Sequence, residues 1–158
     1  MSSSLSQFNT AIYDFVRFIR DTGHMSADVD SLETYIEVTR VNARILISNF
    51  QKYVLRDVFV SNILQNNVNY FLNFDIVKEY NIDDDNIALL INRIRELVGK
   101  LVEEKNTENI DKTFNWIKVL CFHAYTDIGI PAAQKFRALL SIPNIFNSFR
   151  PSGFLTIP

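Results

Sequence analysis

The sequence contains a single cysteine, Cys121, so no disulfide can form within the chain. This scarcity of cysteine is typical of proteins that stay in a reducing compartment. The opening residues Met1–Ser4 have neither the basic region nor the apolar region of a secretory signal peptide. No stretch reaches the ~18 apolar residues that a membrane-spanning helix needs. We therefore expect a soluble protein without a membrane span, made inside the cell.

Proline and acidic residues are unevenly distributed. All four prolines lie between residues 130 and 158, and this segment has no acidic residue. Its three basic residues give it a charge of +3, whereas residues 1–129 carry 13 basic and 18 acidic residues, a charge of −5. Non-specific affinity for nucleic acid comes largely from Lys and Arg that neutralise phosphates. An acidic body is a poor binder of this kind, so nucleic acid is not an expected partner.

Residues 1–129 have the composition and periodicity of one compact helical domain. The whole chain is 47% hydrophobic and 22% charged, as in ordinary globular proteins. Apolar residues recur at helical spacing. The spacing predicts helices over about 5–22, 28–39, 43–54, 86–104 and 107–128, with two short helices between 57 and 80. Residues 58–64 also have the β-branched and aromatic composition of a strand, but their helical neighbours favour helix. The acidic run Asp83–Asp85 suits a helix start.

The expected fold class is therefore all-α, a bundle of five to seven helices (1–129) followed by an extended apolar C-terminal arm (130–158). Pro131 suits the first turn of a short helix in the arm, and Pro143 would end that helix. An apolar segment is costly to leave in water, so it must pack on its own domain or on a neighbour. We predict a protein-docking arm, with these interface residues: Phe136, Leu139, Leu140, Ile145, Phe146, Phe149, Phe154 and Leu155.

No motif predicts a catalytic or metal site. A calcium loop counted from Asp83 would need Gly and Glu where Ala88 and Ile94 stand. Cys121 and His123 are two residues apart on a helix, so their side chains diverge. Cys121 falls on the apolar face and is expected to be a core residue. We therefore expect no cofactor, no small-molecule substrate and no enzymatic activity.

Two further features allow a surface role. Arg40 and Arg44 lie one turn apart, with Lys52 and Arg56 further along the chain. They form either a basic face for nucleic acid or a solvated surface paired with acidic residues such as Glu33 and Glu37. Trp116 falls beside the main apolar stripe of its predicted helix, so it is either a core residue or a contact residue on the surface.

Several segments resemble small helical proteins of nucleocytoplasmic large DNA viruses, the phycodnavirus-like group especially. The resemblance spans roughly residues 7–124 and lies in Phe8-Asn9-Thr10, Asn42-Ala43-Arg44, residues 50–54, Asn69-Tyr70-Phe71-Leu72 and residues 114–120. The chain departs from this pattern at Ala43, where proline is expected, and at His24-Met25-Ser26, where an acidic turn is expected. The arm lies outside the resemblance.

The resemblance implies a virion structural protein, a minor capsid component that bridges or supports the capsomers. Its implied partners are the major capsid protein and other minor capsid proteins. Its implied location is the virion, after synthesis in the host cytoplasm. The alternative is a non-enzymatic helical adaptor that binds a partner protein and keeps the arm in its own core. Association with nucleic acid is a third, weaker reading.

Overall fold

A computed structural model describes residues 3–23, 33, 37 and 44–141 of the chain. Within these residues it contains eight helices and no strand, which confirms the all-α prediction. The helices are α1 (Ser4–Asp21), α3 (Ile45–Tyr53), α4 (Asp57–Leu64), α5 (Val68–Asn73), α6 (Ile76–Glu79), α7 (Asp85–Glu103), α8 (Thr107–Ile128) and α9 (Ile130–Ser141).

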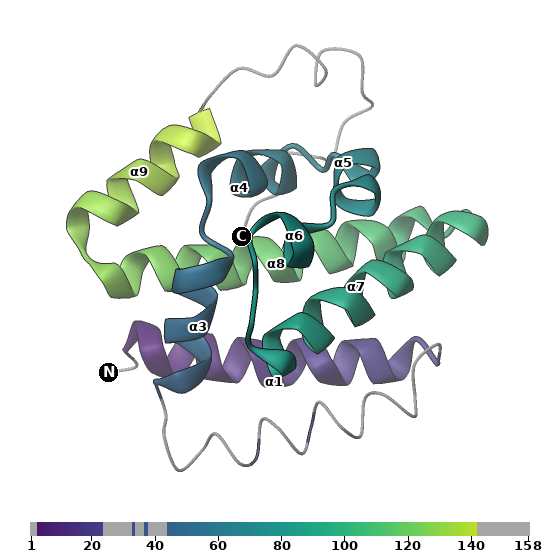
Figure 1. The fold of residues 1–158 in the computed structure, drawn as a ribbon, viewed down its shortest axis with the longest axis horizontal. Helices are drawn as coiled ribbons and strands as arrows, with labels where there is room; N and C mark the ends of the chain where they lie inside the picture. The colour runs from purple at the N-terminus through teal and green to yellow at the C-terminus, as the bar shows by residue number, and fades with distance from the viewer. Residues whose placement is uncertain (1–2, 24–32, 34–36, 38–43, 142–158) are drawn as a thin grey trace.

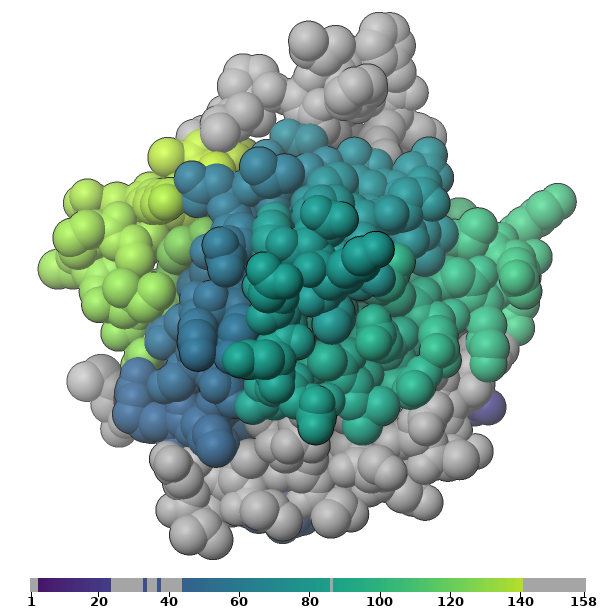
Figure 2. All heavy atoms as spheres, in the orientation of Figure 1, coloured from purple at the N-terminus to yellow at the C-terminus, as the bar shows by residue number. Residues whose placement is uncertain are grey.

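Helix α8 is the central element of the bundle. It contacts α1, α3, α4, α7 and α9. Figure 1 shows α1 along one edge beside α8, α7 joined to α8 by a tight turn, and α9 folded back past α4. The space-filling view shows α9 packed against α4 at one side of the molecule (Figure 2). A helix with neighbours on most sides must be apolar around most of its circumference. This explains why nine residues of α8 are buried.

Short polar side chains determine where several helices begin. The first turn of a helix leaves backbone N–H groups without partners, and a preceding Ser, Asp or Asn can accept from one of them. In each case the oxygen accepts from the N–H three residues later, at 2.9–3.2 Å, in Ser3, Asn67, Asp75, Asp84 and Asn106. Asp84 belongs to the acidic run that the sequence analysis placed at a helix start, so that prediction is confirmed.

Three helices end in the same hydrogen-bonded turn. After α4, α6 and α7 a residue adopts a left-handed conformation, with φ of 54° at Asn66, 51° at Asn81 and 57° at Lys105. After α7, the Lys105 N–H donates to the Val102 carbonyl at 3.0 Å, and the Asn106 N–H donates to the Leu101 carbonyl at 2.9 Å. This pair of bonds defines a Schellman cap. Asn tolerates the conformation, whereas Lys105 is strained in it.

Lys105→Gly is therefore expected to raise the free energy of unfolding by about 0.5–1 kcal/mol, because glycine adopts positive φ without steric cost. Urea unfolding followed by circular dichroism measures the change. Glu104→Gly is the matched control, because Glu104 is exposed but is not among the positive-φ residues. The control should lower stability, and a loss of stability in both variants would contradict this explanation of the turn.

Two parts of the fold differ from the helices expected from the sequence. Residues 57–80 form three helices rather than two, because Asn66–Asn67 and Phe74–Asp75 each interrupt the backbone ladder. The described part of residues 1–129 still holds seven helices, α1 and α3–α8, within the five to seven expected. The short helix predicted in the arm is present as α9, with Pro131 in its first turn. Of the predicted helix over 28–39, only residues 33 and 37 are described, and both are helical.

Candidate protein-interaction surface

The first part of the C-terminal arm packs on the bundle. Phe136 of α9 is 1% exposed, and its ring centroid lies 5.5 Å from that of Tyr125 and 5.9 Å from that of Phe122. Lys135 of α9 pairs with Asp57 of α4 at 2.9 Å. The arm was expected to begin at residue 130 and to offer Phe136 to a partner. In the structure Phe136 is instead a core residue, because α9 folds back onto α8 and α4.

The other residues predicted for docking fall into two groups. Leu139 and Leu140 are half-buried and pack against the core, so each keeps part of its surface in solvent. Five predicted residues lie outside the described part of the chain: Ile145, Phe146, Phe149, Phe154 and Leu155.

Exposed apolar side chains gather near the junction of α8 and α9. Among the described residues, six large apolar side chains are conspicuously exposed, and three of them fall within residues 122–130. The most exposed, Ile130, keeps 75% of its surface in solvent. Ile128 and Ile130 flank Gly129, whose φ of 141° lets the chain turn between the two helices. This turn projects two isoleucines together.

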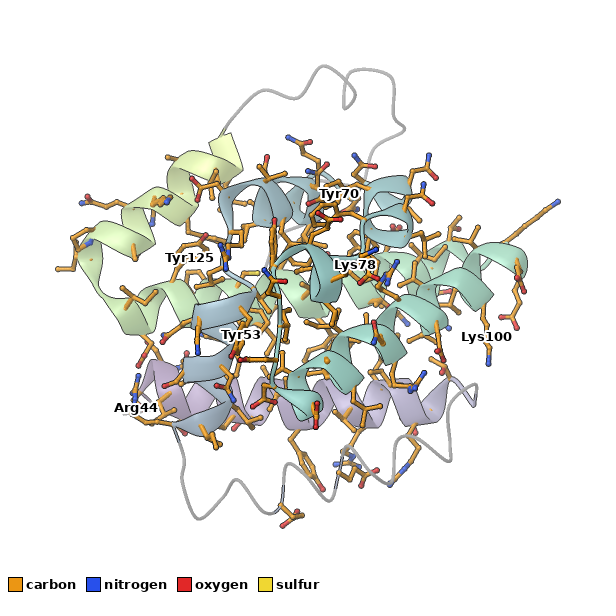
Figure 3. The ribbon with its side chains drawn as sticks, in the orientation of Figure 1. Arg44, Tyr53, Tyr70, Lys78, Lys100 and Tyr125 are labelled. Atoms are coloured by element: carbon orange, nitrogen blue, oxygen red, sulfur yellow. The ribbon has the colours of Figure 1, made fainter. Side chains whose placement is uncertain are left out.

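Two more exposed apolar residues each follow a residue that forms an ion pair with α8 or α9. Ile45 follows Arg44, which pairs with Asp127 near the end of α8. Val58 follows Asp57, which pairs with α9. We call these five residues, Ile45, Val58, Phe122, Ile128 and Ile130, the elbow surface. The sixth exposed residue, Val102, is close in sequence to Lys100, and Figure 3 places Lys100 at the opposite end of the molecule from Arg44.

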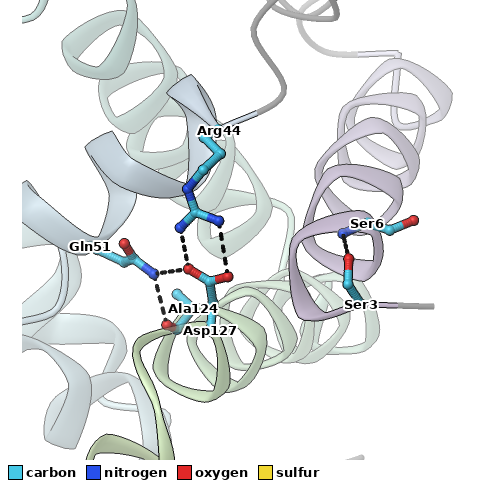
Figure 4. Close-up of polar contacts among 6 residues, drawn as sticks. All are labelled: Ser3, Ser6, Arg44, Gln51, Ala124 and Asp127. Carbon is cyan, nitrogen blue, oxygen red and sulfur yellow. Dashed lines mark hydrogen bonds and ion pairs between the residues drawn. The ribbon is translucent and has the colours of Figure 1, made fainter. Parts of the chain in front are cut away.

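A polar clamp fixes α3 against the end of α8 (Figure 4). The Arg44 guanidinium donates to both carboxylate oxygens of Asp127, at 3.2 and 2.5 Å. The Gln51 amide donates to the same carboxylate at 2.9 Å and to the Ala124 carbonyl at 3.0 Å. The hydrogen bonds from Arg44 hold the pKa of Asp127 below its usual range. The clamp therefore stays ionised at neutral pH and holds the elbow surface in place.

The basic residues considered for nucleic-acid binding do not form one open face. Arg44 is engaged by Asp127, whereas Glu33, one of the acidic residues considered as its partner, pairs with Arg20 of α1. The Lys52 ammonium lies 4.8 Å from the Tyr53 ring centroid, and the Arg56 guanidinium lies 4.7 Å from that of Tyr80. Arg40 lies outside the described residues. These contacts agree with the solvated-surface reading of the described cations.

Trp116 occupies a position between core and surface. It is half-buried, and its ring is stacked on that of Phe15 with centroids 6.0 Å apart and planes at 17°. Phe15 itself is fully buried in α1. One face of Trp116 therefore completes the α1–α8 packing. Its remaining surface is available for contact.

Cys121 and His123 have environments that suit packing better than chemistry. Cys121 is fully buried, and burial raises the pKa of its thiol to about 12. The thiol therefore stays protonated, whereas a nucleophilic cysteine needs a thiolate. Burial lowers the pKa of His123 below its ordinary value. Within the described part of the chain, no three His, Cys, Asp or Glu side chains converge as metal ligands.

Lys118 is a buried charge that the sequence analysis missed. It lies on α8 with no exposed surface. Burial lowers the pKa of its ammonium to about 8, while Asp111 opposes the change. The sequence spacing does indicate that Lys118 is buried. Lys118 comes four residues after Phe114 and three before Cys121, on the apolar stripe of its helix. A lysine at such a position must either reach solvent or lose its hydration.

Comparisons of the chain with protein-family models, curated proteins and solved structures found no match. Of the helices described above, none is long and apolar enough to cross a membrane.

Proposed function

We propose that this chain is a structural protein that binds protein neighbours through the elbow surface and the adjoining C-terminal segment. The observation that carries the proposal is the concentration of exposed apolar side chains at the α8–α9 junction. Scattered apolar residues are normal on protein surfaces, whereas a local concentration is typical of an interaction site. Here three of the six such residues of the described chain, Phe122, Ile128 and Ile130, lie within nine residues of sequence at one junction.

The position of this surface suits docking. The clamp and α9 hold it against the central helix, so little conformational entropy is lost when a partner binds. Ser141, at the end of α9, leads directly into residues 142–158, which contain five of the predicted docking residues. The apolar sequence segment thus follows directly on α9, the helix whose first residue, Ile130, belongs to the elbow surface. Together they offer one extended site for a protein neighbour.

The setting that we propose for this role is the capsid of a large DNA virus. The chain would be a minor capsid component that bridges or supports capsomers, with the major capsid protein and other minor capsid proteins as partners. This part rests on the sequence resemblance. If it is correct, mass spectrometry should find the chain in purified particles of the virus that encodes it. Absence from those particles would contradict the capsid setting, while the docking proposal would still stand.

The docking proposal is tested by a double variant, Ile128→Glu with Ile130→Glu. Both residues are exposed, so the folded chain should tolerate the change, and its circular dichroism and unfolding midpoint should stay near those of the parent. Two carboxylates at the elbow should prevent apolar burial against a partner. We expect incorporation into particles, measured by quantitative mass spectrometry, to fall at least about ten-fold, since ~1.4 kcal/mol of lost binding is a factor of ten.

Val102→Glu is the matched control, because Val102 is 40% exposed at the far end of the bundle. It should be incorporated at the level of the parent chain. Equal incorporation of the parent and the double variant would contradict docking through the elbow.

The second candidate function is a helical adaptor outside any capsid. The burial of Phe136 favours it, because an adaptor was expected to keep part of the arm in its own core. The two readings use the same elbow surface and differ only in the partner. Particle composition therefore separates them.

A further inference from the structure

Two hollows on the surface share Trp116 of α8 as a lining residue, and the larger one is lined by residues of both α1 and α8. One has a volume of about 320 Å³ and is lined by Ser6, Gln7, Thr10, Ala11, Asp14, Trp116 and His123. The other has a volume of about 240 Å³ and is lined by Lys112, Asn115, Trp116 and Val119. The two hollows share no residue with the elbow surface, although the ring of Phe122 lies 5.3 Å from that of His123.

The larger hollow combines a carboxylate with an aromatic wall. Asp14 is exposed, and no ion pair or hydrogen bond within the described residues engages its carboxylate. The nearest cation along α1, Arg17, lies over the ring of Tyr13 at 5.8 Å. No lysine or arginine among the described residues lines this hollow. Among the described residues that line this hollow, the one fixed charge is therefore negative.

The other polar groups that line the hollow also suit a ligand that donates hydrogen bonds. Ser6, Gln7 and Thr10 carry hydroxyl or amide oxygens that can accept hydrogen bonds. His123 stands at the same wall, and burial keeps its pKa low, so at neutral pH its ring is uncharged and does not repel a cation. Trp is the aromatic side chain that binds a cation best across its face.

We propose that the α1–α8 hollow binds an arginine side chain of a protein partner, with the guanidinium against the Trp116 indole and hydrogen-bonded to Asp14. Arginine fits better than lysine, because its planar guanidinium both stacks on an aromatic ring and donates two parallel bonds to a carboxylate. The inference rests on the proposed role as a protein-binding chain, in which the arginine is supplied by a neighbour. It adds a polar, specific contact to the apolar contact made by the elbow.

The test uses the full chain and the fact that Trp116 is its only tryptophan. A ¹H–¹⁵N correlation spectrum then contains a single indole N–H signal, which reports on this hollow without assignment of the rest. N-acetyl-arginine amide is titrated into the labelled protein, and N-acetyl-citrulline amide, which has nearly the same shape without the charge, is the ligand control. We expect a saturable shift of the indole signal with the arginine compound and none with the citrulline compound.

Two variants establish that Asp14 is the partner. Asp14→Asn should weaken the binding of the arginine compound at least about ten-fold, because the charge-assisted bonds are lost. Asp21→Asn removes a carboxylate at the end of the same helix that does not line the hollow, and it should leave binding unchanged. The proposal is overturned if the arginine compound gives no saturable shift. It is equally overturned if the citrulline compound shifts the indole signal of the parent protein as the arginine compound does. The same holds if the arginine compound binds Asp14→Asn as tightly as it binds the parent protein. Neither result depends on the elbow surface, which the particle experiment tests separately.

Discussion

Replacing Phe136 with alanine is expected to lower the free energy of unfolding of the whole bundle by about 3–5 kcal/mol. Phe136 is almost fully buried between the rings of Phe122 and Tyr125, so its removal loses apolar burial and leaves a cavity. Its partners lie on α8, the helix that contacts most of the others. The loss should therefore appear in the single unfolding transition of the domain, measured by urea titration with circular dichroism.

Ile130→Ala is the control for this prediction, because Ile130 lies on the same helix but is largely exposed. Its effect should stay within about 0.5 kcal/mol, as for most surface substitutions. If Phe136→Ala also had no effect, α9 would not be part of the bundle. The predicted boundary at residue 129 would then be the right one.

Replacing Lys118 with methionine is expected to raise the free energy of unfolding at pH 7 by about 1–3 kcal/mol. The two side chains have similar volumes, and methionine needs no hydration. In the folded chain burial lowers the pKa of Lys118 to about 8, against about 10.5 for an ordinary lysine. Each unit of difference corresponds to about 1.4 kcal/mol, which sets the upper end of the expected gain.

The same substitution should change how stability depends on pH. Between pH 8 and 10.5 the unfolded chain keeps a proton on Lys118 that the folded chain has lost, so raising the pH in this window favours the folded state. Below pH 8 Lys118 is protonated in both the folded and the unfolded chain, so the folded chain bears the full free-energy cost of burying the charged ammonium. The advantage of Lys118→Met over the parent should therefore be largest at pH 7 and should shrink as the pH approaches 10.5.

Lys112→Met provides the comparison, because Lys112 is an exposed lysine on the same helix, paired with Glu108. It should change stability by less than about 1 kcal/mol, with no pH dependence in this window, as for other surface ion pairs. If Lys118→Met instead lowered stability at pH 7, the contacts of the Lys118 ammonium would stabilise the fold by more than the loss of its hydration costs. That outcome would contradict the account of the buried charge.

Much of the helical framework could be predicted from the sequence because its signals are local. The apolar stripe from Ile87 to Leu101 and the acidic run before it predicted α7, and α7 begins where Asp84 caps it. The limits predicted for α8, residues 107 and 128, also agree with the structure, in which Asn106 caps the first turn and Gly129 follows the last residue. Such signals depend on residues three or four apart, which a reader of the sequence can see.

The long-range contacts could not be predicted in this way. The clamp joins Arg44 to Asp127 across 83 residues of sequence, and no local pattern indicates that pairing. Likewise, an apolar residue such as Phe136 has the same periodicity whether it packs on its own domain or on a partner. Whether Phe136 packs on its own domain or on a partner depends on the direction that the chain takes after Gly129. A turn at glycine allows many directions.

The packing of α9 also changes how the docking role should be tested. Truncation after Gly129 would remove Phe136 from the core, so it would destabilise the bundle as well as delete the arm. Truncation after Ser141 keeps α9 and removes only the remaining arm residues. The second truncation should leave a folded chain with reduced binding to its neighbours.

The most direct test of the account is a photo-crosslinker placed at the elbow. Benzoylphenylalanine replaces Ile130 in the chain, the chain is assembled into particles, and crosslinked products are identified by mass spectrometry. Val102 carries the same group in the control, because it is exposed at the opposite end. The account predicts crosslinks from position 130 to a capsid protein and far fewer from position 102. Equal yields from the two positions, or no crosslink from position 130, would contradict it.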